Sequence, residues 1–240
     1  MATTTIHPAE VRRELTVRPL VDGDHLTADE FLRRYEAMPD VNKAELIEGV
    51  VHMPSPVTFV DHGGPDFDLM TWLGIYRIHT PGVQGAGNTT IQLDLDNVPQ
   101  PDAFLRILTE CGGQSRVVGK YLHGGPELTA EIAASSASYD LHEKFNAYRR
   151  NGVREYVVWR VWDEAIDWFV LRSGKYEPLP LDSDGCYRSE VFPGLWLDPQ
   201  ALISGDMLRV ESVLHRGLAD AAHAAFVQEL NERRKASSSE

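Results

Sequence analysis

The sequence predicts an α/β (α+β) domain, in which a mixed central sheet is flanked by helices and followed by a long C-terminal helix. Short apolar runs with strand character alternate with segments whose apolar residues recur every three or four positions. Gly and Pro residues separate these runs, and 240 residues suffice for one substantial domain with extensions. We therefore expect a flexible leader over residues 1–24, the main domain over 25–205, and a helix and tail over 206–240.

Composition restricts the class of protein. No apolar run is long enough to span a membrane, and the first residues lack the apolar segment of a signal peptide. Cys111 and Cys186 are too few for a disulfide framework, so we expect a cytoplasmic protein. The net charge of −13 argues against nucleic-acid binding through the whole surface, because neutralised phosphates supply most non-specific affinity. A nucleic-acid partner would need a local basic strip.

The first half of the chain predicts two helices and a hairpin. Thr27 is expected to cap the first helix, with Glu30 completing a capping box. Apolar residues on both sides of Glu48-Gly49 predict a β-hairpin over 44–53. A second helix is expected over 65–79. Its buried side is predicted to carry Phe67, Leu69, Met70, Trp72, Leu73 and Tyr76. The remaining expectations are a loop over 82–87, a strand over 89–95 and a strand beginning at Asp102.

The second half predicts more strands and two further helices. A surface loop is expected over 109–125, because the segment is polar and rich in glycine. Asp140 and Glu143 predict a second capping box for a helix over 141–151, which Gly152 would end. Strands are expected over 153–161, 166–171, 175–179 and 191–197, with a hairpin turn at Ser173-Gly174. From residue 206 onward, helical spacing predicts one amphipathic helix of about 28 residues, which would either self-associate or pack against the domain.

Two acids and an amine are the strongest chemical signal. Asp102 opens an apolar run, and Glu131 stands inside another at 128–133. A carboxylate in an apolar strand is costly to bury unless it is paired or binds a cation. Lys144 follows on the next predicted helix, near the end of the Glu131 strand. This trio predicts a divalent-metal site built for phosphate chemistry, with the backbone carbonyl of Ile132 as a further ligand.

Hydrolysis of a phosphodiester requires an activated water, neutralised phosphate oxygens and help for the leaving oxygen. Mg²⁺ or Mn²⁺ held by Asp102 and Glu131 would supply most of this, and Lys144 would orient the water or stabilise the growing charge. Simpler explanations stay open for each residue. Asp102 is also a common type of strand-start acid, and Glu131 with Lys144 would also make a structural ion pair.

Other polar groups give weaker signals. His62 has no second His or Cys at metal-ligand spacing, which favours a histidine in a loop or at a helix entry. The glycines over 82–87 lack the Lys-Ser/Thr of a phosphate loop. The arginines at 149, 150 and 154 form the basic cluster near the predicted site, where they would follow a phosphate backbone or favour a helix C-terminus.

Several short motifs occur in a specific order along the chain. They are Glu45-Leu46-Ile47-Glu48-Gly49, Pro101-Asp102, Ala130-Glu131-Ile132, the spaced Asp140, Lys144, Tyr148, Gly152-Val153 and Glu155-Tyr156, and the late Phe192-Pro193-Gly194-Leu195. In this order they resemble the Uma family, a group of bacterial proteins described as restriction endonucleases within the PD-(D/E)xK nuclease superfamily. The resemblance covers about residues 26–203.

The resemblance implies a restriction-endonuclease-like core, a divalent metal and often a homodimer. The spacing of the C-terminal helix makes that helix the expected contact of a homodimer. Carried over residue by residue, Asp102 and Glu131 match the metal carboxylates. Lys144 matches a lysine that has moved from the strand to the following helix, and Glu45 matches an early acid. On its own, the residue pattern leaves Glu45 open to a solvated position beside a turn.

Three positions depart from the usual pattern. Ala133 stands where the superfamily's lysine usually lies, and Ala134-Ser135-Ser136 replaces the Ser-Pro-Ser of the Uma pattern. Trp159-Arg160 replaces an acidic strand end. We predict a Mg²⁺-dependent endonuclease that acts on DNA or another phosphodiester. The alternatives are a catalytically silent nuclease-like module that binds a protein partner, and a metal-dependent hydrolase of small phosphates.

Overall fold

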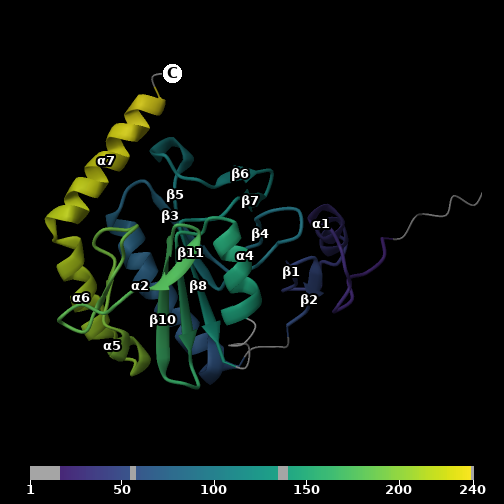
Figure 1. The fold of residues 1–240 in the computed structure, drawn as a ribbon, viewed down its shortest axis with the longest axis horizontal. Coiled ribbons are helices and arrows are strands. Elements are labelled where there is room, and N and C mark those ends of the chain that lie inside the picture. The colour runs from purple at the N-terminus through teal and green to yellow at the C-terminus, as the bar shows by residue number, and fades with distance from the viewer. Residues whose placement is uncertain (1–16, 55–57, 135–139, 239–240) are drawn as a thin grey trace, which may run out of the picture.

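The computed structural model describes residues 17–54, 58–134 and 140–238, and the side chain of residue 140 lies outside this description. A six-stranded sheet forms the centre, in the order β11-β10-β9-β8-β5-β3 (Figure 1). Its strands are β3 (Val83–Gly87), β5 (Ala103–Ile107), β8 (Leu128–Ala133), β9 (Glu155–Arg160), β10 (Ala165–Arg172) and β11 (Lys175–Pro178). Strands β8 and β9 are parallel and the other neighbours are antiparallel, which confirms the predicted mixed sheet.

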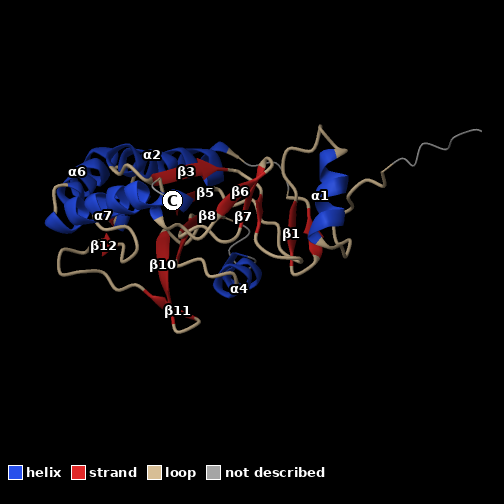
Figure 2. Ribbon diagram, turned by 90° about the horizontal axis from the view of Figure 1, so that it is seen from above, coloured by secondary structure: helices blue, strands red, loops and turns tan. Residues whose placement is uncertain are grey.

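Helices cover both faces of this sheet (Figure 2). They are α2 (Gly64–His79), α4 (Phe145–Arg150), α5 (Pro199–Ile203), α6 (Met207–Leu218) and α7 (Ala221–Ser237), while α1 (Ala28–Glu36) lies apart from the sheet. Helices α2, α6 and α7 share one apolar core with the sheet, and α4 packs on the opposite face. Short helical turns are η1 (Phe59–Gly63), η2 (Thr109–Cys111) and η3 (Asp140–Lys144). No helix in the described ranges is both long and apolar enough to cross a membrane.

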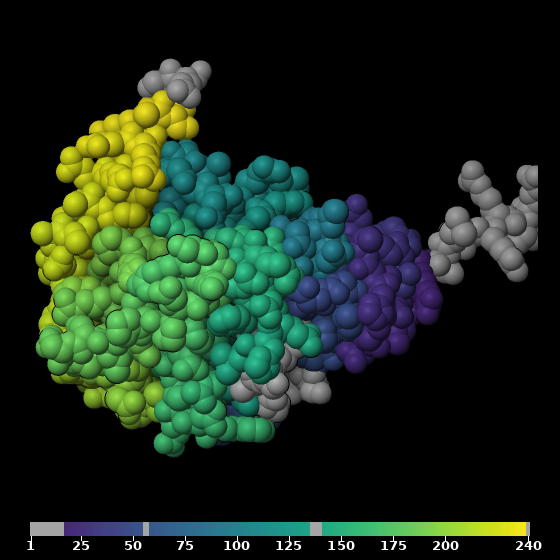
Figure 3. Space-filling view, viewed as in Figure 1, coloured from purple at the N-terminus to yellow at the C-terminus, as the bar shows by residue number. Residues whose placement is uncertain are grey.

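A small lobe at the N-terminal side packs on its own apolar cluster (Figure 3). It contains α1 and the antiparallel hairpin of β1 (Glu45–Ile47) and β2 (Val50–His52). Glu48 and Gly49 both have positive φ, which is the backbone of a tight hairpin turn, and this confirms the predicted hairpin. Leu20 is buried against this lobe, so part of the segment expected as a leader is packed; residues 1–16 lie outside the described residues.

The capping box predicted for α1 is wrong. Thr27 occupies the N-cap position, but its side chain makes no capping hydrogen bond. Glu30 instead binds Arg33 and Arg34 on the same helix. The guanidinium groups of Arg33 and Arg34 lie one helical turn from Glu30 and bind its carboxylate, which therefore does not reach the backbone N–H at the N-cap. The capping box predicted at Asp140 lies outside the described side chains.

The loop predicted over 82–87 is wrong, because Val83–Gly87 is the edge strand β3. Gly87 packs so closely that a Cβ atom would lie 2.7 Å from the carbonyl oxygen of Asp102. The glycines therefore permit close strand pairing instead of breaking the strand. The strand predicted over 89–95 is shorter than expected, since β4 covers only Ile91–Gln92.

The loop predicted over 109–125 contains η2 and the hairpin of β6 (Arg116–Val118) and β7 (Tyr121–His123). Strand β7 also pairs in parallel with β4, which makes a small three-stranded sheet. A second short pair, β12 (Tyr187–Arg188) and β13 (Trp196–Leu197), lies before α5. The strand predicted over 191–197 is therefore reduced to β13. The other partners are only two or three residues long, which is too short for a period-2 pattern to reveal them.

The single C-terminal helix predicted from residue 206 is two helices. Asp220 caps α7 by accepting the N–H of Ala222, and α6 ends two residues earlier. His223 then contacts Thr80 and the carbonyl of Leu218, while Leu230 packs at Gly82. Helix α7 therefore packs back onto the domain. The prediction that Phe67 is buried is also wrong, since this side chain is exposed on α2.

Candidate active site

Asp102 lies directly before β5 and is almost completely buried. Its Oδ1 atom is 3.0 Å from Lys43 Nζ and 3.2 Å from His62 Nε2, and its Oδ2 atom accepts the N–H of Ile132 at 2.8 Å. Burial by itself would raise the pKa of Asp102, but the hydrogen bond from His62 and the charge of Lys43 outweigh it. The pKa of Asp102 is therefore held well below its usual range, and the group is a carboxylate.

Lys144 bridges the other two predicted acids. Its Nζ atom is 3.0 Å from Oε1 of Glu131 and 3.0 Å from Oε1 of Glu45. All three side chains are buried. Glu131 also accepts the hydroxyl of Tyr148 at 2.7 Å, and Glu45 accepts the N–H of Gln100 at 2.7 Å. Burial and the charge of Glu131 raise the pKa of Tyr148 well above its usual value, so the hydroxyl remains a donor.

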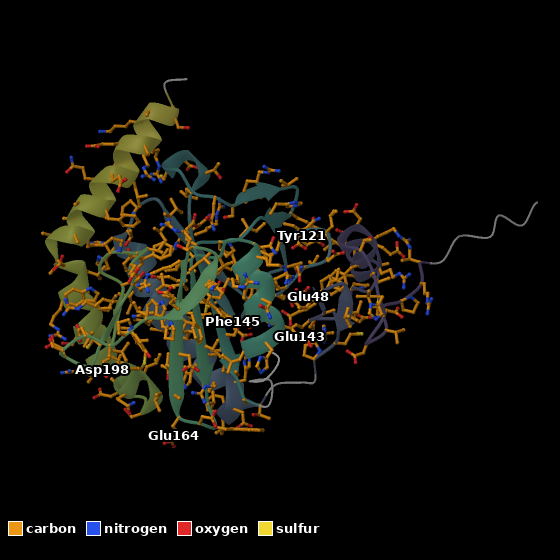
Figure 4. The ribbon with its side chains drawn as sticks, in the orientation of Figure 1. Glu48, Tyr121, Glu143, Phe145, Glu164 and Asp198 are labelled. Atoms are coloured by element: carbon orange, nitrogen blue, oxygen red, sulfur yellow. The ribbon has the colours of Figure 1, made fainter. Side chains whose placement is uncertain are left out.

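The sheet and the hairpin bring these residues together. Strand β5 begins beside the middle of β8, with Ala103 opposite Ala130, so Asp102 reaches the backbone just after Glu131. Lys144 and Tyr148 are one helical turn apart and both reach Glu131. Ion pairs of Arg150 with Glu48 and of His52 with Glu143 join the hairpin that carries Glu45 to α4 and η3, and Figure 4 labels the two glutamates. The structure thus places Glu45, Asp102, Glu131 and Lys144 in one buried group.

Three neighbours of this group were missed or discounted on sequence grounds. Lys43 was not singled out, although it stands two residues before Glu45. His62 was assigned to a loop or helix entry; it does lie directly before α2, but it also binds Asp102. Asp66, in the first turn of α2, was missed, and burial followed by the charge of Asp102 raises its pKa. No local signal identifies these three, because Asp102 is far from each of them along the chain.

The residues fit an oxygen-binding divalent cation such as Mg²⁺. Asp102, Glu131 and the carbonyl of Ile132 offer hard oxygen ligands on neighbouring strands. The Oδ1 atom of Asp66 is buried without a hydrogen-bond partner among the described residues, which is a further oxygen for a cation or its water shell. Across the described ranges, no three His, Cys, Asp or Glu side chains are already gathered as a metal-binding group. Cationic side chains stand among the carboxylates instead.

The predicted basic cluster does not surround this site. Arg149 and Arg150 lie at the C-terminal end of α4, whereas Lys144 precedes its first residue. Arg149 donates to the carbonyl of Gly174, and Arg150 forms an ion pair with Glu48. Arg154 stands just before β9, at the end of that strand opposite to Arg160. These three side chains therefore do not contact the carboxylates of the site in the described residues.

The structure also shows where the residues that depart from the family pattern lie. Ala133, where a lysine is usual, is buried at the end of β8, and its carbonyl accepts the N–H of Val161. Lys144 supplies an ammonium group to Glu131 from the helix side. Arg160, at the usual acidic strand end, pairs with Asp167 and Asp163. Residues 135–139, which contain most of the altered turn, lie outside the described residues.

Comparison with known proteins identifies a family and a related fold. The model of the family described as "Uma2: Putative restriction endonuclease" matches residues 28–200. A crystal structure described as "a putative nuclease belonging to DUF820" from Anabaena variabilis superposes with a TM-score of 0.52 at 15% identity, covering 74% of this chain and 99% of that one. At this identity the likeness concerns the fold. No curated protein sequence matches the chain. The predicted resemblance and the restriction-endonuclease-like fold are confirmed.

Proposed function

The chain belongs to the Uma2 family, and from this premise we propose that it is a Mg²⁺- or Mn²⁺-dependent endonuclease that hydrolyses phosphodiester bonds in DNA. One observation carries the proposal. Asp102 binds the backbone N–H of Ile132, the residue after Glu131, so two buried carboxylates from neighbouring strands meet around one stretch of backbone. Burial of two acids at one place needs positive charge to offset it. In a nuclease that charge is shared by a metal and a lysine.

Asp102, Glu131 and the carbonyl of Ile132 would hold the metal. When bound, the ion would supply Lewis-acid charge to a phosphate oxygen and lower the pKa of a bound water. The protein's own groups orient the site before it acts. Tyr148 fixes one oxygen of Glu131, and the N–H of Ile132 fixes one oxygen of Asp102. A ligand set that is already oriented loses less entropy when the cation binds.

Lys144 is the buried cation that we assign to the phosphate. It stands between Glu131 and Glu45, which hold its ammonium group in one position. A fixed positive charge in a buried site stabilises the negative charge that grows on the phosphate during hydrolysis. The role of Glu45 is to hold Lys144 there, since Glu45 is itself anchored by the N–H of Gln100.

Lys43 and His62 add positive charge on the Asp102 side. Both contact the same oxygen, Oδ1, which is an oxygen that a metal would need. Burial disfavours the charged form of Lys43, but the charges of Asp102 and Glu45 outweigh it and raise its pKa. Lys43 is therefore an ammonium group that neutralises Asp102, and it would be available to a phosphate if a cation were bound by Asp102.

The test is a cleavage assay with supercoiled plasmid and labelled single-stranded DNA in Mg²⁺ or Mn²⁺. We expect Asp102→Asn, Glu131→Gln and Lys144→Met each to lower the rate at least about a hundredfold. Glu155→Gln is the matched control, because it also changes a buried acid on a neighbouring strand but lies outside the site. Full activity in the Glu131→Gln variant would refute the site assignment.

The acidity of the chain favours a second candidate, a hydrolase of small phosphates. A net charge of −13 and the pairing of Arg150 with Glu48 disfavour long duplex DNA. The same assay should therefore include nucleotides and a bis-phenyl phosphodiester. Turnover of the small esters without cleavage of DNA would favour this candidate. Metal binding without any turnover would favour the silent module that binds a partner.

A further inference from the structure

Trp162 is unlike the other tryptophans of this protein. It lies in the turn between β9 and β10 and is 64% exposed. The remaining four are partly or fully buried, namely Trp72, Trp159, Trp168 and Trp196. Phe59, in η1, is 81% exposed. We call this pair, Phe59 and Trp162, the aromatic turn. Large rings are costly to leave in water, so two of them on linked turns require an explanation.

The aromatic turn is held in place by hydrogen bonds. Trp162 Nε1 donates to Oδ1 of Asp61 at 3.1 Å, which ties its ring to η1. The other oxygen of Asp61 accepts the hydroxyl of Thr58 at 2.8 Å, and Thr58 in turn accepts the N–H of Asp61. A ring fixed in this way offers its face to a ligand at a low cost in conformational entropy.

Two short paths connect Trp162 to the candidate site. Asp61 is followed by His62, which contacts Asp102. Val161, the residue before Trp162, donates to the carbonyl of Ala133, two residues beyond Glu131 on β8. Two residues along a strand span only about 7 Å. The aromatic turn therefore lies within a few nucleotides of both carboxylates, since successive phosphates of a DNA strand are about 3.4 Å apart along the axis.

The charges around the turn disfavour direct phosphate contacts at the rings themselves. Asp61, Asp163 and Glu164 are acidic, and Figure 4 shows Glu164 at the outer end of the β9–β10 turn. Arg160, the nearby cation, is already paired with Asp163 and Asp167. An acidic rim beside a fixed indole ring suits an uncharged, flat, aromatic group.

We propose that the aromatic turn stacks an unpaired base of single-stranded nucleic acid beside the catalytic site. The proposal rests on the proposed nuclease function and names its preferred substrate class. Bases in a duplex have their faces covered by their neighbours, so only unstacked bases reach such rings. Stacking on aromatic side chains is tolerant of sequence, and it depends on salt less than phosphate contacts do.

The test measures binding of fluorescein-labelled dT15 and of a 15-base-pair duplex by anisotropy, in EDTA so that cleavage does not interfere. We expect the wild type to prefer dT15, and Trp162→Ala to weaken dT15 binding about five- to a hundredfold. Trp162→Phe should keep most of the affinity because it keeps a ring. Leu208→Ala is the control, since Leu208 is also an exposed apolar side chain but lies on α6.

Quenching of tryptophan emission supplies a second readout. Titration with dT15 should quench the wild type and leave Trp162→Phe nearly unquenched, because Trp162 is the most exposed of the tryptophans. Raising NaCl from 50 to 200 mM should weaken dT15 binding less than tenfold, whereas six to ten phosphate contacts would lose about a thousandfold or more.

Three results would overturn the proposal. These are wild-type affinity in Trp162→Ala, an equal loss for dT15 and duplex, and a change confined to self-association on size-exclusion chromatography. The last would make the turn a contact between copies of the chain. The outcome is separable from that of the nuclease proposal. Trp162-dependent binding without cleavage refutes only the nuclease, and cleavage with Trp162-independent binding refutes only the aromatic turn.

Discussion

Buried carboxylates lie toward the C-terminal end of β8, at the candidate site, and at the N-terminal ends of β8 and β9, and the two ends stabilise the buried charge in different ways. At the site end, Glu131 contacts an ammonium group, and nearby Asp102 contacts a second one and a histidine. At the opposite end, Glu127 accepts the N–H groups of Ile107 and Gln114. Glu155 there accepts the hydroxyl of Ser189 and the N–H groups of residues 190 and 191.

The difference shows that burial of a carboxylate does not by itself mark an active site. Fixed backbone donors tie Glu127 and Glu155 to neighbouring loops, which is a structural role. Lysine and histidine side chains are cations that can exchange with a metal or a phosphate. The pKa values differ accordingly. Burial raises the pKa of Glu155 to about 7, whereas His62 and Lys43 keep the pKa of Asp102 low despite its burial.

The largest expected effect is at the site end. Lys144→Met should lower the free energy of unfolding by about 3–5 kcal/mol, because it leaves two buried carboxylates without the ammonium group between them. Urea denaturation measures this. The double variant Glu131→Gln/Lys144→Met should recover part of the loss, since it removes one uncompensated charge. A loss below about 1 kcal/mol in the single variant would mean that water already solvates the pair.

The next effect concerns pH and the opposite end. The pKa of Glu155 is raised in the folded state, so the folded protein binds its proton more tightly and stability falls as pH rises from about 4.5 to about 7. Glu155→Gln should remove this dependence. Its stability relative to the wild type should increase by up to about 3 kcal/mol between pH 4.5 and 8. Parallel pH profiles of thermal unfolding for the two proteins would show instead that Glu155 titrates normally.

Asp102 should behave in the opposite way. Its lowered pKa contributes stability above the pKa of the unfolded chain, and this is lost as pH falls below about 4. Asp102→Asn should therefore cost about 2–3 kcal/mol at pH 7 and less at pH 3, which chemical denaturation at the two values measures. An equal loss in the free energy of unfolding at both pH values would show that the substitution acts through packing and not through charge.

A smaller effect is expected on metal affinity, which should change only for substitutions at the site end of β8. Lys43→Met should tighten Mn²⁺ binding about tenfold in calorimetry, because it removes a cation that competes for Oδ1 of Asp102. Glu127→Gln should leave the Mn²⁺ affinity unchanged. Weaker binding in Lys43→Met would show that Lys43 holds Asp102 in position for the metal and does not compete with it.

The smallest effect tests the surface. Arg150 and Glu48 form an exposed pair that joins α4 to the hairpin. Arg150→Ala should change the free energy of unfolding by less than about 1 kcal/mol and leave cleavage unchanged, because exposed pairs are screened by water and salt. A marked loss of DNA cleavage would show that the arginine cluster does follow a phosphate backbone.

Much of the fold was predictable from local patterns. The turns at Glu48-Gly49 and Ser173-Gly174 predicted both hairpins, because these residues adopt positive φ, and the apolar runs predicted β5, β8 and β9. Strand β3 was not predictable in this way, since its glycines favour a loop until pairing with β5 is taken into account. The helical spacing did not predict the break between α6 and α7. The break lets His223 and Leu230 contact the domain.

The sequence by itself determined the chemical types and their order, namely Glu45, Asp102, Glu131 and Lys144 on a strand–strand–helix pattern that identifies the family. Only the tertiary structure decided which cations meet these acids. Lys43 and His62 contact Asp102 although they lie 59 and 40 residues before it in the sequence. Trp162 contacts Asp61 in η1 across 101 residues of sequence. Local propensity acts over a few neighbouring residues, whereas a buried charge is stabilised by whatever folding places around it.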